Sequence, residues 1–107
     1  MATYVPKELR APTAITASYA TVYTATGVTG VMRSYAFTVL NTPHNAFLSR
    51  EAGAAGTLIV NNEAIPTTSP LKDNGWWVVP QSGILQVKAD SIATDVPNFG
   101  AWGLEYS

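Results

Sequence analysis

The segment Val31 to Asn41, which reads VMRSYAFTVLN, carries the longest β-strand signal in the chain. Its aromatic and β-branched residues favour extended backbone, and apolar side chains fall on both faces of the alternating pattern. By simple alternation one face carries Val31, Tyr35, Phe37 and Val39, and the other carries Met32, Ala36 and Leu40. A strand with two apolar faces is typical of the middle of a sheet, so the segment predicts a central strand. Arg33 interrupts the first face, where the strand would emerge into solvent or meet a neighbour.

Shorter segments of the same type lie on both sides of this strand, between clusters of Gly, Pro and Asn. The sequence predicts further strands at residues 14–17, 20–25, 46–49, 57–61, 63–65, 76–79, 84–89 and 99–106. Asn61 and Asn62 are expected to form a tight hairpin turn, and residues 50–56 and 67–74 to form loops. About eight short strands predict an all-β, single-domain antiparallel β-sandwich, of jelly-roll or immunoglobulin-like kind.

The N-terminal residues differ from the rest of the chain. Pro6 and Pro12 lack a backbone N–H, and they fit an extended arm better than a fully paired strand. A chain of 107 residues is normally one domain. We therefore predict an extended N-terminal arm over residues 1–12 and a β-sandwich domain over residues 13–107.

The composition argues against several classes of partner. Charged residues make up only 12% of the chain, about half the usual share. The six Lys and Arg and the seven Asp and Glu are scattered, so the sequence has no basic patch for nucleic acid or anionic lipid. The absence of cysteine favours maturation in a reducing cytoplasm. Because we find neither a signal-peptide pattern nor an apolar stretch of about 18 residues, we expect neither export nor membrane insertion.

The residues that carry enzyme chemistry are scarce. His44 is the only histidine, and its place in a Pro-Asn turn predicts a solvated loop residue, so a nucleophile would have no base. Asp90 with Asp95, or Glu51 with Glu63, could be imagined as catalytic pairs, but we interpret them as solubilising charges. One histidine without cysteine does not make a metal centre. We expect no enzyme and no catalytic, cofactor or metal site.

Adjacent tryptophans are the most suggestive local feature. Trp76 and Trp77 must point to opposite faces of a strand, so one indole should lie outside the core. That indole could be covered by the arm or a loop, could stack on a sugar ring, or could be buried against a neighbouring subunit. Candidate interface residues are Tyr4, Val5, Pro6, Leu9, Trp76, Trp77 and Tyr106.

Near the C-terminus, alternate residues form an apolar file. The file consists of Trp102, Leu104 and Tyr106, and we expect it to be the core face of the last strand.

Three segments resemble a group of small bacteriophage virion proteins. They read APTAIT from Ala11 to Thr16, TVYTATGVTGVMRSYAFTVLNT from Thr21 to Thr42, and GWWVVPQSGILQVKA from Gly75 to Ala89. The resemblance implies a β-sandwich virion part, such as a head decoration or cement protein or a tail or neck accessory. It carries no site residues with it.

Together these features predict a bacteriophage structural protein, a capsid decoration or cement protein that binds the head lattice through subunit interfaces. Its expected partners are the major capsid protein and copies of itself, in a homo-oligomer such as a trimer. The alternative is a tail- or neck-associated module that contacts host glycan or other tail proteins. The expected location is the virion, after assembly in the host bacterial cytoplasm.

Overall fold

The computed structural model describes residues 3–50, 58–91 and 96–107. These residues form eight β-strands and no helix. The strands are β1 (Tyr4–Ala14), β2 (Ala20–Thr24), β3 (Thr29–Thr38), β4 (His44–Ser49), β5 (Leu58–Ile65), β6 (Leu71–Val79), β7 (Ile84–Ala89) and β8 (Asn98–Tyr106). A search of the described part of the chain for a helix able to cross a membrane finds none.

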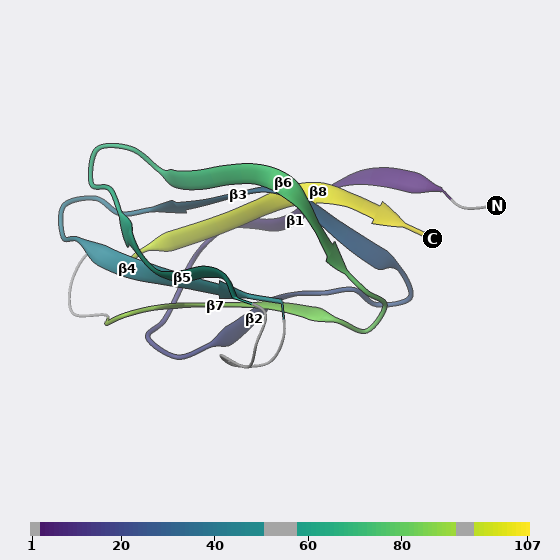
Figure 1. The fold of residues 1–107 in the computed structure, drawn as a ribbon, viewed down its shortest axis with the longest axis horizontal. Helices are drawn as coiled ribbons and strands as arrows, with labels where there is room; N and C mark the ends of the chain where they lie inside the picture. Colours follow the sequence, from purple (N-terminus) through teal and green to yellow (C-terminus); the bar gives the residue numbers. More distant parts are fainter. Residues whose placement is uncertain (1–2, 51–57, 92–95) are drawn as a thin grey trace.

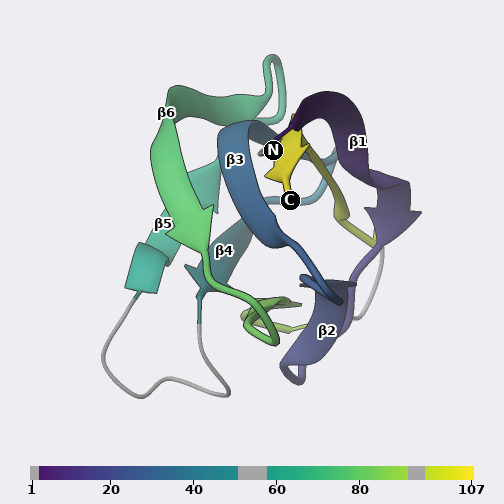
Figure 2. The same cartoon turned by 90° about the vertical axis from the view of Figure 1, so that its right-hand side faces the viewer.

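The first four strands pair in reverse order with the last four, as the two arms of one long hairpin would. β1 pairs with β8, β2 with β7, β3 with β6 and β4 with β5, each antiparallel. Two further pairings, β3 with β8 and β4 with β7, close the hairpin into two layers (Figures 1 and 2). We call β1-β8-β3-β6 the first sheet and β2-β7-β4-β5 the second sheet. Eight strands wrapped in this way form a jelly roll, one of the two sandwich types predicted from the sequence.

The hydrophobic core lies between the sheets and receives side chains from every strand. Phe37 of β3 and Phe99 of β8 are fully buried at its centre, with ring centroids 4.9 Å apart. Complete burial of a side chain of this size contributes about 1.5–3 kcal/mol. β3 lies between β8 and β6, as expected of a central strand.

The N-terminal segment differs from the arm predicted over residues 1–12. Residues 4–12 are extended, but they belong to β1, which pairs with β8 and places Leu9 in the core. Pro6 and Pro12 are tolerated because β1 is an edge strand, so one side of its backbone has no neighbouring strand. The first and last described residues lie side by side here, since the backbones of Thr3 and Ser107 exchange two hydrogen bonds of 2.8 and 3.1 Å (Figure 1).

The hairpin turn predicted at Asn61 and Asn62 is wrong. Both residues lie inside the single strand β5. Asn62 has a φ of 55° and is the extra residue of a β-bulge, because Asn61 pairs with Phe47 while Glu63 pairs with Ala46. The side chain of Asn45 donates a hydrogen bond of 3.0 Å to the Asn62 side-chain oxygen and so holds the bulge.

The loop predicted over residues 67–74 is shorter than expected. Residues 71–74 already belong to β6, because they pair with the backbone of β3. Their mostly polar side chains gave no sign of this pairing in the sequence. In the loop predicted over residues 50–56, residues 51–56 lie outside the described residues.

Candidate interaction surface

One face of the first sheet points away from the core and carries a row of apolar side chains. The register places Pro6 of β1, Leu104 of β8, Val31 of β3 and Val78 of β6 side by side across all four strands. The neighbours of Val31 in sequence, Gly30 and Met32, point inward, so Val31 points outward although it is almost fully buried. We call this side of the first sheet the outer apolar face.

Aromatic residues extend the outer apolar face on both sides of this row. Tyr4 and Tyr106 lie at one end with ring centroids 4.7 Å apart, and their side chains are 59% and 37% exposed. Trp76 of β6 is 55% exposed. The guanidinium carbon of Arg33 lies 4.8 Å from the Trp76 ring centroid, and Arg33 Nε donates a hydrogen bond of 2.7 Å to the Gly75 carbonyl. Arg33 therefore orients Trp76 without removing it from solvent.

Trp102 forms one wall of a small apolar hollow on the same face. Its Nε1 donates a hydrogen bond of 3.1 Å to Glu8 Oε2, which holds the indole against β1. The ring covers Gly100, where a Cβ would approach the indole to 2.7 Å. The hollow has a volume of about 170 Å³ and is lined by Pro12, Ala36, Thr38, Asn98, Phe99, Gly100 and Trp102.

The structure brings four of the seven candidate interface residues together on this face. Tyr4, Pro6, Trp76 and Tyr106 are all exposed there. Their contact with a partner remains a prediction. The remaining three are Val5, Leu9 and Trp77.

Leu9 is buried in the core, and Trp77 packs against Tyr35 at a centroid distance of 5.5 Å. Val5 is exposed but alternates with Tyr4 and Pro6, so it points to the other side of β1. The split between Trp76 and Trp77 confirms that one indole lies outside the core.

The expected orientation of the C-terminal apolar file is wrong. Phe99 and Ala101 supply the core contacts of β8, so Trp102, Leu104 and Tyr106 face outward. Sequence reasoning found this file but assigned it to the core, and it missed Val78. The available signal was that Trp102, Leu104 and Tyr106 alternate along one strand, as an exposed face with Trp76 also would.

His44 is not the solvated loop residue expected from its Pro-Asn context. It is the first residue of β4, is 3% exposed, and places Nδ1 3.1 Å from Asp90 Oδ1 at the end of β7. Burial alone raises the pKa of the Asp90 carboxyl. Hydrogen bonds with His44 and with the Asn45 and Ser91 backbones lower this pKa by more than burial raises it, so the net pKa lies below its usual range. The pair ties two strands of the second sheet together. Glu51 and Asp95 lie outside the described residues.

A second polar cluster links the two sheets near the chain ends. The Tyr23 hydroxyl donates a hydrogen bond of 2.7 Å to Glu105 Oε2, and Lys7 Nζ lies 3.3 Å from Glu105 Oε1. Burial, followed by the hydrogen bond and the charge of Glu105, raises the pKa of Tyr23 far above its usual range. The phenol therefore stays protonated and acts as a donor, so it does not serve as a general base.

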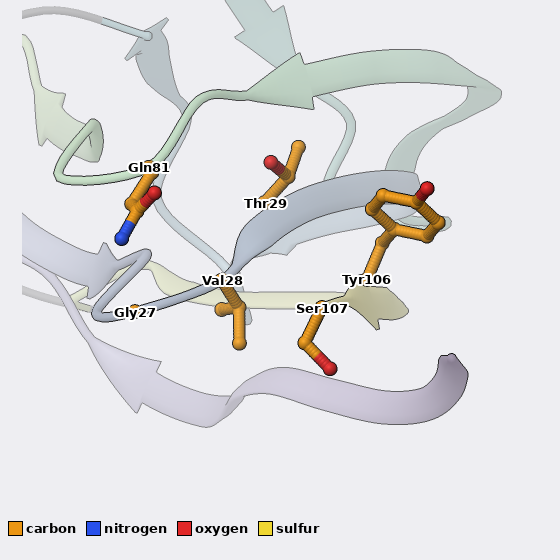
Figure 3. A pocket seen from close by; sticks show the side chains of 6 residues that line it. All are labelled: Gly27, Val28, Thr29, Gln81, Tyr106 and Ser107. Carbon is orange, nitrogen blue, oxygen red and sulfur yellow. The ribbon is translucent and has the colours of Figure 1, made fainter. Parts of the chain in front are cut away.

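An open hollow of about 250 Å³ lies beside these chain ends. Figure 3 shows its lining residues, which come from the β2–β3 turn, the start of β3, the β6–β7 turn and the end of β8. They are Gly27, Val28, Thr29, Gln81, Tyr106 and Ser107. The side chains of this lining offer hydroxyls and an amide, and none of them carries a carboxylate, imidazole or amine. The described residues also contain no cluster of three metal-ligating side chains.

On the opposite face of the molecule, formed by the second sheet, a lysine lies over the aromatic side chains. Lys88 Nζ lies 4.5 Å from the Phe47 ring centroid and 5.2 Å from that of Tyr19. Burying these rings against a partner would also desolvate the ammonium group, which is costly. The outer apolar face of the first sheet is therefore the better candidate for a partner.

Comparisons of the chain with protein-family models, curated proteins and solved structures returned no match. The resemblance to bacteriophage virion proteins therefore stays a prediction.

Proposed function

We propose that this protein is a structural component of a bacteriophage virion, a decoration or cement protein that binds the capsid through subunit interfaces. The observation that carries the proposal is the outer apolar face. It joins Pro6, Leu104, Val31 and Val78 into one row and leaves Trp76 55% exposed. Exposed apolar side chains that lie together, such as Trp76 and the 37% exposed Val78, are typical of a protein-binding site.

Two further features support a structural role in a virion. The jelly roll recurs among viral capsid domains, although a fold alone is only an analogy for function. The low charge of the chain suits a protein whose surfaces are covered by neighbours, because charged residues are depleted from interface cores. The resemblance of three sequence segments to phage virion proteins points the same way.

The second candidate is a tail- or neck-associated module that contacts host glycan or other tail proteins. The hollow beside Trp102 favours it, because Gly100 and Ala36 leave space next to a flat indole on which a sugar ring could stack.

Localisation on intact particles separates these candidates. Antibody labelling and cryo-electron microscopy would be applied to particles of the phage whose genome encodes the chain. We expect density over the whole head surface. Density confined to the tail or neck would replace the decoration role with the second candidate, and particles without the protein would overturn both.

Binding to particles tests the surface itself. Particles that lack the protein would be incubated with the wild type, with Trp76→Ser and with Asn61→Ser, a matched exposed change on the second sheet. We expect Trp76→Ser to reduce the bound amount at least about tenfold, as for an aromatic interface anchor. Equal binding of all three proteins would exclude Trp76 from the interface.

A further inference from the structure

We propose that a second copy of this chain occupies the outer apolar face. Two copies would stack their first sheets face to face around a two-fold axis parallel to the strands. The inference rests on the proposed function in taking this face to be a subunit interface, and it assigns that interface to a second copy of the chain in place of a phage partner.

The size of the face is sufficient for such a pair. Strands lie about 4.8 Å apart and advance about 3.3 Å per residue, so a four-stranded face about nine residues long covers roughly 600 Å². Two copies would bury roughly 1,200 Å² in total, which is the lower limit for a specific, stable pair. Aligned sheet packing of this kind is also what the two sheets of a sandwich do within one chain.

The order of side chains in the apolar row fits a two-fold axis along the strands. That axis reverses the row, so Pro6 would face Val78 of the second copy, and Leu104 would face Val31 of the second copy. Every position of the row then faces an apolar residue, and Val78, which is 37% exposed, has the surface to contact Pro6 of the second copy. An interface related by two-fold symmetry uses the same patch on both copies, as this face would.

The charges on the face favour the same axis. Glu8 lies on β1, at one edge of the sheet, and Arg33 leans over Trp76 of β6, at the other edge. Among the described residues no carboxylate pairs with Arg33. The proposed axis brings Glu8 toward Arg33 of the second copy, twice per dimer. An axis perpendicular to the strands would instead place β1 on β1 and β6 on β6, so Glu8 and Arg33 would stay at opposite edges and could not pair.

Cysteine cross-linking tests the geometry directly, because the chain contains no cysteine. Pro6→Cys and Val78→Cys would be prepared as separate proteins and treated with a bifunctional maleimide, alone and as a mixture. Facing sheets lie about 10 Å apart, which exceeds the roughly 7 Å between Cα atoms that a disulfide can span, so the reagent needs a span of about 10 Å. Each protein carries a single cysteine, so any link must join two copies.

We expect a cross-linked dimer from the mixture and little from either protein alone. A mixture of Pro6→Cys with Asn61→Cys, which lies on the second sheet, is the matched control and should stay unlinked. Links that form only within each single variant would overturn the proposed axis. No link in any sample would overturn the face-to-face pair.

Sedimentation equilibrium tests the energetics. We expect the wild type to dimerise with a dissociation constant in the micromolar range, and Val78→Glu to raise that constant at least about tenfold. Asn61→Glu adds the same charge to the second sheet and should leave the constant unchanged. A wild type that stays monomeric at about 100 µM would overturn the proposal, since face-to-face association would then lie outside that range.

A charge reversal tests the pairing of Glu8 with Arg33. Glu8→Arg and Arg33→Glu should each raise the dissociation constant about tenfold, and the double variant should recover most of the loss. Losses that simply add in the double variant would overturn this pairing. Unfolding midpoints of all variants separate lost association from lost folding.

The two proposals fail independently. A dimer in solution with no protein on phage particles would remove the proposed function and keep the pair. If particles are labelled but the protein is monomeric in solution and the Cys mixture is not cross-linked, the pair is removed and the proposed function is kept.

Discussion

Arg33 changes which side chains of β3 reach the core. It is the extra residue between Met32 and Ser34, where the register against β8 shifts by one position. Simple alternation puts Val31 and Tyr35 on one face, but the bulge reverses the alternation, so Tyr35 points inward and Val31 outward. Burial, with the nearby charges of Asp73 and Glu63, raises the pKa of Tyr35 to about 12.

Gly103 permits this bulge, and its replacement should be severe. A Cβ at Gly103 would collide with the carbonyl oxygen of Val31 and lie 3.0 Å from the Arg33 nitrogen, both of which are backbone atoms. We expect Gly103→Ala to destabilise the fold by about 3 kcal/mol or more, measured as the free energy of unfolding in urea. Gly27→Asn is the control, because its positive φ suits asparagine and the site is open. A loss below about 1 kcal/mol for Gly103→Ala would contradict this close packing.

The carboxylate of Asp90 should make stability depend on pH. Its pKa is lower in the folded state, so its contribution is present above the unfolded pKa and is lost as the pH falls through the folded pKa. We expect Asp90→Asn to cost about 1 kcal/mol at pH 7, as for one hydrogen bond at a partly exposed site. Urea unfolding of both proteins between pH 7 and pH 3 should show the difference shrinking on acidification. A constant difference would exclude Asp90 as the group responsible.

The edge strand β1 is part of the fold, so its removal should be costly. Deletion of residues 1–12 removes Leu9 from the core and leaves the backbone of β8 unpaired along one side. We expect the shortened chain to lose the cooperative unfolding transition of the full chain, followed by circular dichroism in urea. A separate arm would behave differently: the shortened chain would then keep the midpoint of the full chain.

Sequence patterns predicted the strands unevenly. The prediction for residues 84–89 matches β7, because its alternation of apolar and polar residues is uninterrupted. β1 was missed because its prolines argue against pairing, and the first half of β6 because its residues are polar. Edge strands such as these take their conformation from a neighbour on one side, and a single segment does not reveal that neighbour.

In the whole molecule, the pairing of distant segments should make folding slow. β1 pairs with β8 at opposite ends of the chain, so the first sheet is complete only when both termini are in place. We expect refolding from urea on a timescale on the order of milliseconds to seconds, as for other all-β proteins with non-local contacts. Stopped-flow tryptophan fluorescence would follow it, because Trp77 becomes packed against Tyr35. A complete microsecond phase would contradict this expectation.

The candidate surface was only partly visible from the sequence. The opposed orientation of Trp76 and Trp77 follows from strand geometry alone, so one exposed indole was predictable. Pro6 and Val78 lie 72 positions apart in the sequence numbering and share one row only because β8 and β3 lie between their strands. The row depends on sheet register, which local composition does not encode.

Local side-chain chemistry and periodicity were enough to establish an all-β sandwich of about eight strands, because alternation and turn residues act within a few positions. The tertiary structure decided which face of each strand is buried. Alternation divides a strand into two faces without stating which one meets the core, and a bulge such as that at Arg33 exchanges them partway along. Alternation likewise left open that Trp102, Leu104 and Tyr106 face outward. The burial of His44 beside Asp90 depends on the pairing of β4 with β7, which brings the two residues together.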